Sequence, residues 1–250
     1  MPNAQCPIPN SQFCLDRILE SRYRQIRQRV EAQSDFATEE LAKSRALFDL
    51  KLARPIPRRF EVWTCLAGMP VPQHLAGNLQ EIAAAIASLL PPGVRFYQVI
   101  PANYHWELFI IKRSAEEVAR AKLELAGEIL REVLSQQQPL TLSYRGFLIT
   151  PDGTVLAQGY VEGAEIDSLR QKLRSAIPFA SAQQSQLCHI SLGRILDSVG
   201  SESFHQLQDM MRDSQDRFYG DFAIGEVKYV HETQWYMEER EVIETLSLGG

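Results

Sequence analysis

The chain has 250 residues, of which 45% are hydrophobic and 23% charged, and its formal net charge is -5 at pH 7. This composition is typical of a compact globular protein and excludes a long disordered tract. The acidic total argues against a nonspecific nucleic-acid coat, although a small basic cleft for an RNA end can exist within it. No apolar run approaches the roughly 20 residues that cross a bilayer, and the amino terminus has no basic start followed by an apolar core. We therefore expect a cytoplasmic protein that makes no membrane contact.

Cysteine spacing indicates neither a metal site nor a disulfide scaffold. Cys65 and Cys188 lie within apolar segments that are predicted to be strands, where a reduced thiol behaves as a small hydrophobic side chain. Cys6 and Cys14 lie eight residues apart near the amino terminus, and no two of the four cysteines form a Cys-x-x-Cys pair. We expect no bound metal and no cofactor.

Residues 1–57 are predicted to form a helical extension. The segment from Ser11 to about Leu52 contains no Gly or Pro, and its apolar residues recur at helical spacing. Ser34-Asp35 is the expected cap of a second helix, and the prolines that follow Arg54 end the helical region. Two roles are open for the apolar stripe: docking on the protein's own core, which is the commoner outcome, or contact with a protein partner.

Residues 58–250 alternate between predicted strands and helices. Strands are expected at 60–66, 94–100, 104–111, 140–150, 155–161, 187–195, 222–230, 234–241 and 243–248, and helices at 75–90, 114–137, 164–176 and 202–212. Each half of this region ends in a strand that carries a histidine, although the halves share no repeat of residue identity. We therefore predict an α+β fold that is a bilobed pseudo-twofold duplication, with two antiparallel sheets and outer helices facing a central cleft.

Two of the predicted strands carry a histidine two positions before another polar residue. His105 precedes Glu107, and His189 precedes Ser191, so each pair shares one face of its strand. A single such pair is more often a half-buried sheet histidine than a site, but two in one chain favour a site. Two facing imidazoles can act as general base and general acid, because an unperturbed imidazole titrates near pH 6.5. A neighbouring hydroxyl can donate to a phosphate oxygen, which is an arrangement suited to phosphodiester cleavage.

The segment His189-Ile190-Ser191-Leu192-Gly193-Arg194, preceded by the segment 146–160, resembles the carboxy-terminal motif of the 2H phosphoesterases. Members of that family carry two His-x-Thr/Ser motifs on strands of two related lobes, and they include RNA 2′,3′-cyclic phosphodiesterases and 2′-5′ RNA ligase-like proteins. The resemblance extends from about Phe60 to Leu248, so the amino-terminal helices are an addition to it.

The resemblance implies a hydrolase that cleaves a cyclic nucleotide phosphate, or an RNA-terminal 2′,3′-cyclic or 2′,5′ phosphodiester, without a metal. By position, His105 and His189 would be the acid-base pair and Ser191 a phosphate-binding hydroxyl. Arg194 would be a charge partner, although its odd spacing from His189 turns it to the opposite face unless a bulge re-aims it. Tyr104 is a further candidate substrate contact. It could stack on a base, although core packing is the commoner role of an aromatic residue in a strand.

Glu107 departs from the family pattern, which has Thr or Ser at this position. An ionised carboxylate only accepts hydrogen bonds and repels a phosphate. Three outcomes are open: Glu107 is neutral or neutralised by a basic side chain, it binds a metal with the two histidines, or the activity has been lost. The last outcome defines an alternative function, a noncatalytic nucleotide-binding or protein-interaction module.

Overall fold

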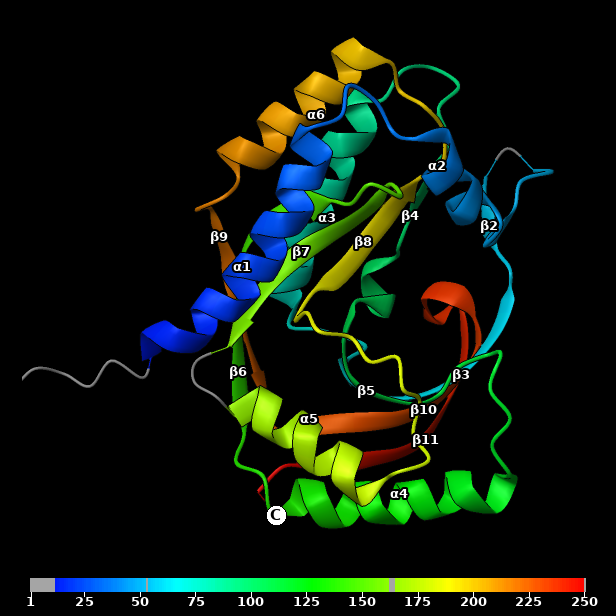
Figure 1. The fold of residues 1–250 in the computed structure, drawn as a ribbon, viewed down its shortest axis with the longest axis vertical. Helices are drawn as coiled ribbons and strands as arrows, with labels where there is room; N and C mark the ends of the chain where they lie inside the picture. Colours follow the sequence, from blue (N-terminus) through cyan, green and yellow to red (C-terminus); the bar gives the residue numbers. More distant parts are fainter. Residues whose placement is uncertain (1–11, 53, 162–164, 250) are drawn as a thin grey trace, which may run out of the picture.

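The computed structural model describes residues 12–52, 54–161 and 165–249 (Figure 1). Its helices are α1 (Gln12–Glu31), α2 (Thr38–Arg45), α3 (Gln73–Leu89), α4 (Arg120–Ser135), α5 (Glu165–Ala176) and α6 (Ser201–Asp213), with the 3-10 turns η1 (Pro101–Asn103) and η2 (Trp235–Met237). Its strands are β1 (Phe48–Asp49), β2 (Ile56–Pro57), β3 (Arg59–Gly68), β4 (Phe96–Gln98), β5 (His105–Lys112), β6 (Leu140–Ile149), β7 (Thr154–Val161), β8 (Ile190–Ile195), β9 (Phe218–Ile224), β10 (Glu226–Gln234) and β11 (Glu239–Ser247). Within this part of the chain, no helix combines the length and the apolarity needed to cross a bilayer.

Apart from β1 and β2, which pair only with each other, the strands form one antiparallel sheet in the order β11-β10-β3-β5-β8-β7-β6-β9, with β4 paired to β8. This confirms the α+β prediction. The two predicted sheets are joined into one, because β5 and β8 pair at Trp106 and Ile190. Farther along β8, residues from Gly193 to Ile195 pair with β4 instead, so the two halves diverge from that single junction. Helices α4 and α5 lie in one half, and α1, α3 and α6 lie in the other (Figure 1). The pseudo-twofold relation between the halves stays a prediction.

The inner face of α1 docks on the half of the sheet that contains β6 and β7. Leu19, Tyr23 and Val30 are buried and belong to the same hydrophobic core as the sheet. The Tyr23 hydroxyl donates to the Gly159 carbonyl oxygen at 3.1 Å, and it accepts from the Gly159 and Cys188 amides at 3.2 and 3.3 Å. These contacts lie where the pairing of β7 with β8 ends. The apolar stripe therefore serves the protein's own core, and a partner contact through the helices stays a prediction.

Removing the Tyr23 hydroxyl should destabilise the fold. In Tyr23→Phe, the buried Cys188 amide and the Gly159 backbone groups lose their partner, so we expect the free energy of unfolding to fall by about 1–3 kcal/mol. The matched control is Tyr104→Phe, because the Tyr104 hydroxyl is buried without a hydrogen-bond partner among the described residues. Urea unfolding should show a lower midpoint for Tyr23→Phe only. Equal midpoints for both variants would contradict the bridging role of Tyr23.

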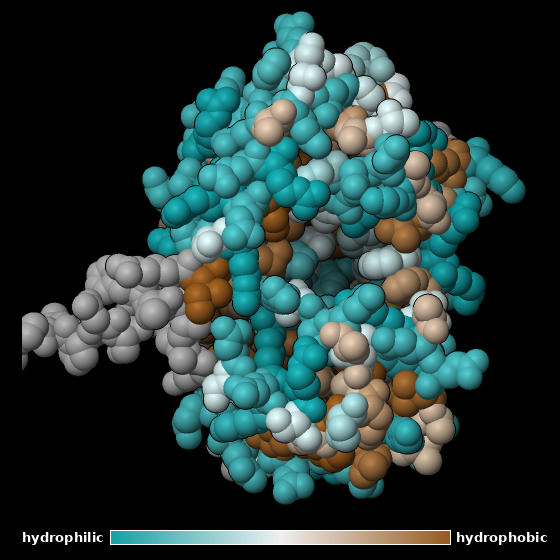
Figure 2. Space-filling view, in the orientation of Figure 1, coloured by the Kyte–Doolittle hydropathy of each residue, from teal (hydrophilic) through white to brown (hydrophobic). Residues whose placement is uncertain are grey.

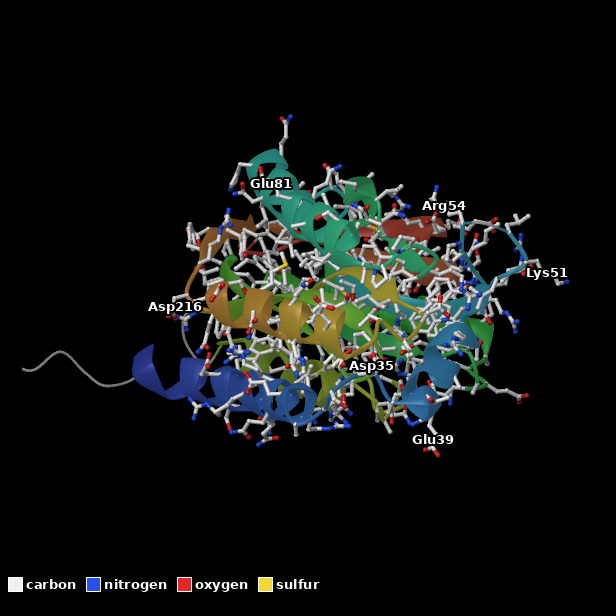
Figure 3. The ribbon with its side chains drawn as sticks, turned by 90° about the horizontal axis from the view of Figure 1, so that it is seen from above. Asp35, Glu39, Lys51, Arg54, Glu81 and Asp216 are labelled. Atoms are coloured by element: carbon white, nitrogen blue, oxygen red, sulfur yellow. The ribbon has the colours of Figure 1, made fainter. Side chains whose placement is uncertain are left out.

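Asp35 does not cap the second helix, contrary to the sequence prediction. Helix α2 begins after Ala37 and has no side-chain cap. The Asp35 carboxylate instead accepts from the backbone amides of Val199 and Gly200 at 3.2 and 2.9 Å, just before α6 begins (Figure 3). Because Gly200 has no side chain to cap α6, a residue far away in sequence orders this turn. Local sequence could not reveal that long-range role.

Candidate active site

The two predicted histidine strands bring their polar side chains to one small cavity. His105, Glu107, His189 and Ser191 all line this cavity, whose volume is about 140 Å³. Since Trp106 pairs with Ile190 in antiparallel strands, the register places Glu107 across from His189 and His105 across from Ser191. The space-filling view shows the surface hollowed between the two halves of the molecule (Figure 2). Four of the six predicted site residues therefore come together.

His105 is held in one orientation by the backbone of the η1 turn. Its Nδ1 lies 2.8 Å from the Asn103 carbonyl oxygen, which can only accept a hydrogen bond. In the neutral ring the proton is therefore on Nδ1, and Nε2 keeps its lone pair. Burial lowers the pKa of His105, and the nearby Arg240 lowers it further against the opposing effect of the Asn103 hydrogen bond. His105 is thus a neutral imidazole at pH 7, in the tautomer that suits a base.

The pKa of His189 is also lowered, and burial is again the main cause. Burial lowers the pKa of His189 to about 4, and the charges of His105 and Arg170 act in the same direction. Its Nδ1 is buried and has no hydrogen-bond partner in the described part of the chain. A buried nitrogen without an acceptor is better left unprotonated, so the ring proton of the neutral form belongs on Nε2. The two rings therefore differ in which nitrogen carries the proton.

Glu107 is buried among groups that do not fully neutralise it. Burial raises its pKa, while Arg113, the Thr64 hydroxyl and Arg170 oppose that shift. Thr64 Oγ1 lies 3.4 Å from Glu107 Oε2, and Arg113 lines the same cavity. The net direction is a raised pKa, so the surroundings make the ionised carboxylate less favourable than it is in water.

Sequence reasoning missed a second carboxyl group in the cavity. Glu232, on β10, lines it together with Glu107, and its Oε1 accepts from the Met237 amide at 2.9 Å. Burial raises the pKa of Glu232 to about 8, and the charge of Glu107 adds to the effect. The only sequence signal was a polar residue shortly before the aromatic pair Trp235-Tyr236, which is too weak to identify a site.

Arg194 is turned toward the cavity side of its strand by a bulge. Val155 pairs with Gly193 while Leu156 pairs with Ser191, so β8 contains one extra residue between them. The extra residue turns the Arg194 side chain to the face of the strand that carries His189, as the odd spacing between the two residues required.

The guanidinium of Arg194 is occupied by protein groups. It donates to the Tyr236 hydroxyl at 2.9 Å and to Ser44 Oγ at 3.0 Å, and it lies 3.4 Å from Asp152 Oδ2. Arg194 is not among the side chains that line the cavity. The charge partner of Arg194 is therefore Asp152. Arg194 is linked to the cavity only indirectly, through its hydrogen bond to Tyr236, whereas the prediction was a direct contact with substrate.

Tyr104 does not line the cavity, contrary to the expectation that it contacts substrate. Its side chain is fully buried in the core. The aromatic wall comes from residues far apart in sequence, Phe60 on β3 and Trp235 on η2, whose rings stack at 4.0 Å between centroids. Tyr236 lines the cavity beside them. Because core packing is the commoner role of aromatic residues in strands, Phe60, Trp235 and Tyr236 were not predicted to line the site.

Arg170, on α5, joins the two histidine strands from the side opposite the cavity. Its guanidinium donates to the carbonyl oxygens of Glu107, Leu108 and Leu187 at 3.2, 3.1 and 3.0 Å. It also lies 5.6 Å from the centroid of the Trp106 ring. One cation thereby satisfies carbonyl groups on β5 and on the segment that leads into β8, next to the single residue pair that joins the two strands. Arg170 is a positioning residue that sequence spacing did not reveal.

The described residues contain no group of three His, Cys, Asp or Glu side chains arranged to hold a metal ion. His105, Glu107 and His189 share a cavity without forming such a group. The geometry therefore gives no support to the alternative in which these three bind a metal.

No protein-family model and no curated protein matches the chain. Solved structures do match it in fold. TT0787 of Thermus thermophilus is 16% identical, with a TM-score of 0.52 over 77% of this chain and 98% of that chain. E. coli LigT in apo form is 14% identical, with a TM-score of 0.52 over 78% and 99%. A crystal structure described as a phosphoesterase is 17% identical, with a TM-score of 0.50 over 78% and 100%. The chain therefore has the fold of these structures, one of which is described as a phosphoesterase.

Proposed function

We propose that the protein is a phosphodiesterase that cleaves a cyclic nucleotide phosphate or an RNA-terminal 2′,3′-cyclic or 2′,5′ phosphodiester. The observation that carries the proposal is the shared cavity: two histidines from different strands line it together with the Ser191 hydroxyl. A cavity of about 140 Å³ is of the right order for a phosphate group and part of a ribose. The neighbouring Phe60–Trp235 stack offers an aromatic face to a nucleobase.

The tautomers of the two rings suggest their roles. His105, with a free Nε2 lone pair, removes a proton from water as the water oxygen bonds to phosphorus. The bond from phosphorus to the ribose oxygen then breaks, and this oxygen takes a proton from Nε2 of His189. The ring of His189 must be an imidazolium to act as the acid, and a bound phosphate anion favours this form by raising its pKa. Ser191 donates a hydrogen bond to a non-bridging phosphate oxygen.

Hydrolysis of a 2′,3′-cyclic nucleotide, measured with and without a chelator, tests the proposal. We expect turnover to a nucleoside monophosphate at equal rates in both conditions, because the proposed proton transfers use side chains alone. The product can be resolved by chromatography or phosphorus NMR. Absence of turnover with both cyclic and 2′,5′-linked substrates would refute the proposed activity, and a chelator-sensitive rate would favour a metal.

The second candidate function is a noncatalytic nucleotide-binding or protein-interaction module. It is favoured by Glu107, which stands where the family carries a hydroxyl, and by the second carboxyl of Glu232 in the same cavity. Calorimetry with nucleotides distinguishes the candidates, since binding without turnover supports the module. Turnover that appears only in Glu107→Thr would identify an enzyme that has lost its activity at this residue.

A further inference from the structure

Tyr236 is a buried side chain whose hydroxyl group uses only half of its hydrogen-bonding capacity. The residue is 6% exposed, and it lines the cavity together with both histidines and Ser191. Its hydroxyl oxygen accepts a hydrogen bond from Arg194 Nε at 2.9 Å. A phenolic hydroxyl can also donate one, and among the residues that the structure describes none accepts from it. The hydroxyl proton is therefore available to a molecule in the cavity.

Arg194 fixes the direction of that proton. Its guanidinium is held by Ser44 Oγ at 3.0 Å and by Asp152 Oδ2 at 3.4 Å. Because arginine only donates, it occupies a lone pair of the Tyr236 oxygen and turns the hydroxyl hydrogen away from itself. The bulge in β8 puts Arg194 on the face that carries Ser191. The Tyr236 oxygen therefore lies on the side of the cavity that Ser191 lines.

The backbone holds Tyr236 in a conformation that residues other than glycine seldom adopt. The φ angle is +62° at Tyr236 and +58° at Met237. Such angles cost free energy, so they persist where surrounding contacts impose them, and they cluster at functional sites. Here the Met237 amide donates to Glu232 Oε1 at 2.9 Å, and the Met237 carbonyl oxygen accepts from Arg240. Both backbone groups of Met237 are thus fixed, and they fix the turn that presents Tyr236.

Aromatic packing orients the Tyr236 ring. Phe48 and Tyr97, which do not line the cavity, lie 6.0 and 4.8 Å from it between ring centroids. Phe48 on β1 and Ser44 on α2 both belong to the amino-terminal extension. This extension therefore helps to position a cavity residue that follows it by almost 200 positions in the sequence.

The cavity lacks a hydroxyl at Glu107, the position where the 2H phosphoesterase motif has Thr or Ser. We propose that the Tyr236 hydroxyl donates a hydrogen bond to a non-bridging oxygen of the substrate phosphate and so replaces the missing donor beside Ser191. A tyrosine keeps its proton at neutral pH, since its usual pKa is near 10 and burial raises the pKa of Tyr236. This inference rests on the proposed function, because it requires that a phosphate enters the cavity.

The first test measures binding to the full chain. Tyr236→Phe removes the hydroxyl and keeps the ring. We expect it to weaken the binding of inorganic phosphate, 2′-AMP and 3′-AMP by about 10-fold each, because a hydrogen bond to a charged oxygen is lost. The two nucleotides are the possible products of 2′,3′-cyclic AMP hydrolysis, so calorimetry can measure their Kd without turnover. Inorganic phosphate has no base or ribose, so its affinity reports on the phosphate contact alone.

Tyr97→Phe is the matched control for binding. Tyr97 packs in the same ring cluster, but its hydroxyl donates to Glu238 and it does not line the cavity. It should bind all three ligands like the wild type. Wild-type affinity of Tyr236→Phe for phosphate would overturn the donor role. A loss of affinity for the nucleotides alone would also overturn it, because the hydroxyl would then contact the base or the ribose.

The second test uses the unaltered chain and separates contact with phosphate from positioning of Arg194. Carbon-13 NMR of protein labelled at the tyrosine Cζ atoms should show a Tyr236 resonance, assigned by its loss in Tyr236→Phe, that moves as phosphate is added. The Tyr97 resonance should stay in place, because Glu238 already accepts from that hydroxyl. If phosphate binds and the Tyr236 resonance does not move, the donor role is overturned even where Tyr236→Phe binds weakly.

Failure of the donor role and failure of the proposed function give different results. A wild type that hydrolyses a cyclic or 2′,5′-linked nucleotide, with a Tyr236→Phe variant of equal rate and affinity, would overturn the donor role alone. A wild type that neither cleaves these substrates nor binds the nucleotides or phosphate would refute the proposed function, and the donor role with it.

Discussion

His189→Ala is expected to lower kcat/KM for a 2′,3′-cyclic nucleotide by about 1000-fold, because general acid-base catalysis contributes roughly 10²–10⁴. In the proposed mechanism the substitution removes the proton that the departing ribose oxygen takes up. His105→Ala should have a similar effect through loss of the base. Since the proposed mechanism uses the two rings in one proton-transfer cycle, the double variant should be little worse than either single variant. Initial rates over a range of substrate concentrations give these values.

The control for this prediction is His205→Ala, because His205 lies on the exposed face of α6 away from the cavity residues. It should hydrolyse substrate at the wild-type rate. Circular dichroism and urea unfolding should show that His189→Ala is folded, so that a lost rate reports on chemistry. Unchanged kcat/KM in folded His189→Ala would exclude the acid-base mechanism even if the wild type is active.

The two histidine strands could be predicted from local sequence, because recognising them requires only the alternation of side chains along a strand. His105 with Glu107 and His189 with Ser191 each needed only a two-residue period to share a face. The resemblance of the second motif to a known family then implied that the strands meet, which the Trp106–Ile190 pair now shows. The helix expected at 114–137 begins only at Arg120, since acidic residues near a predicted start do not fix where the first turn forms.

The remaining site residues depend on contacts between segments that are distant in sequence. Glu232 belongs to the cavity only because β10 pairs with β3, and Arg170 reaches the histidine strands only because α5 packs across them. Neither has a local signature, since an acid in a strand and an arginine in a helix are ordinary surface residues in sequence. Tyr104 was wrongly predicted to contact substrate, because it lies beside His105 in sequence although its side chain belongs to the core.

Gly159→Ala is expected to destabilise the protein and to disturb the position of His189. A Cβ at residue 159 would lie 1.7 Å from the Cys188 carbonyl oxygen and 3.0 Å from the Tyr144 ring. The carbonyl is backbone and cannot rotate away as a side chain can, so β7 and the segment before β8 must separate. We expect the free energy of unfolding to fall by about 3 kcal/mol, at the upper end of the usual cost of overpacking. Urea unfolding at constant m-value measures the change.

Gly77→Ala is the matched control, because the same substitution there meets open space within helix α3. It should stabilise the protein by about 0.5–1 kcal/mol through helix propensity. The opposite signs of the two Gly→Ala changes separate a steric effect from any general effect of an added methyl group. Since Cys188 directly precedes His189, Gly159→Ala should also weaken nucleotide binding in the fraction that folds, whereas Gly77→Ala should bind like the wild type. Equal unfolding midpoints for Gly159→Ala and the wild type would mean that β7 and the segment before β8 are not in close contact next to His189.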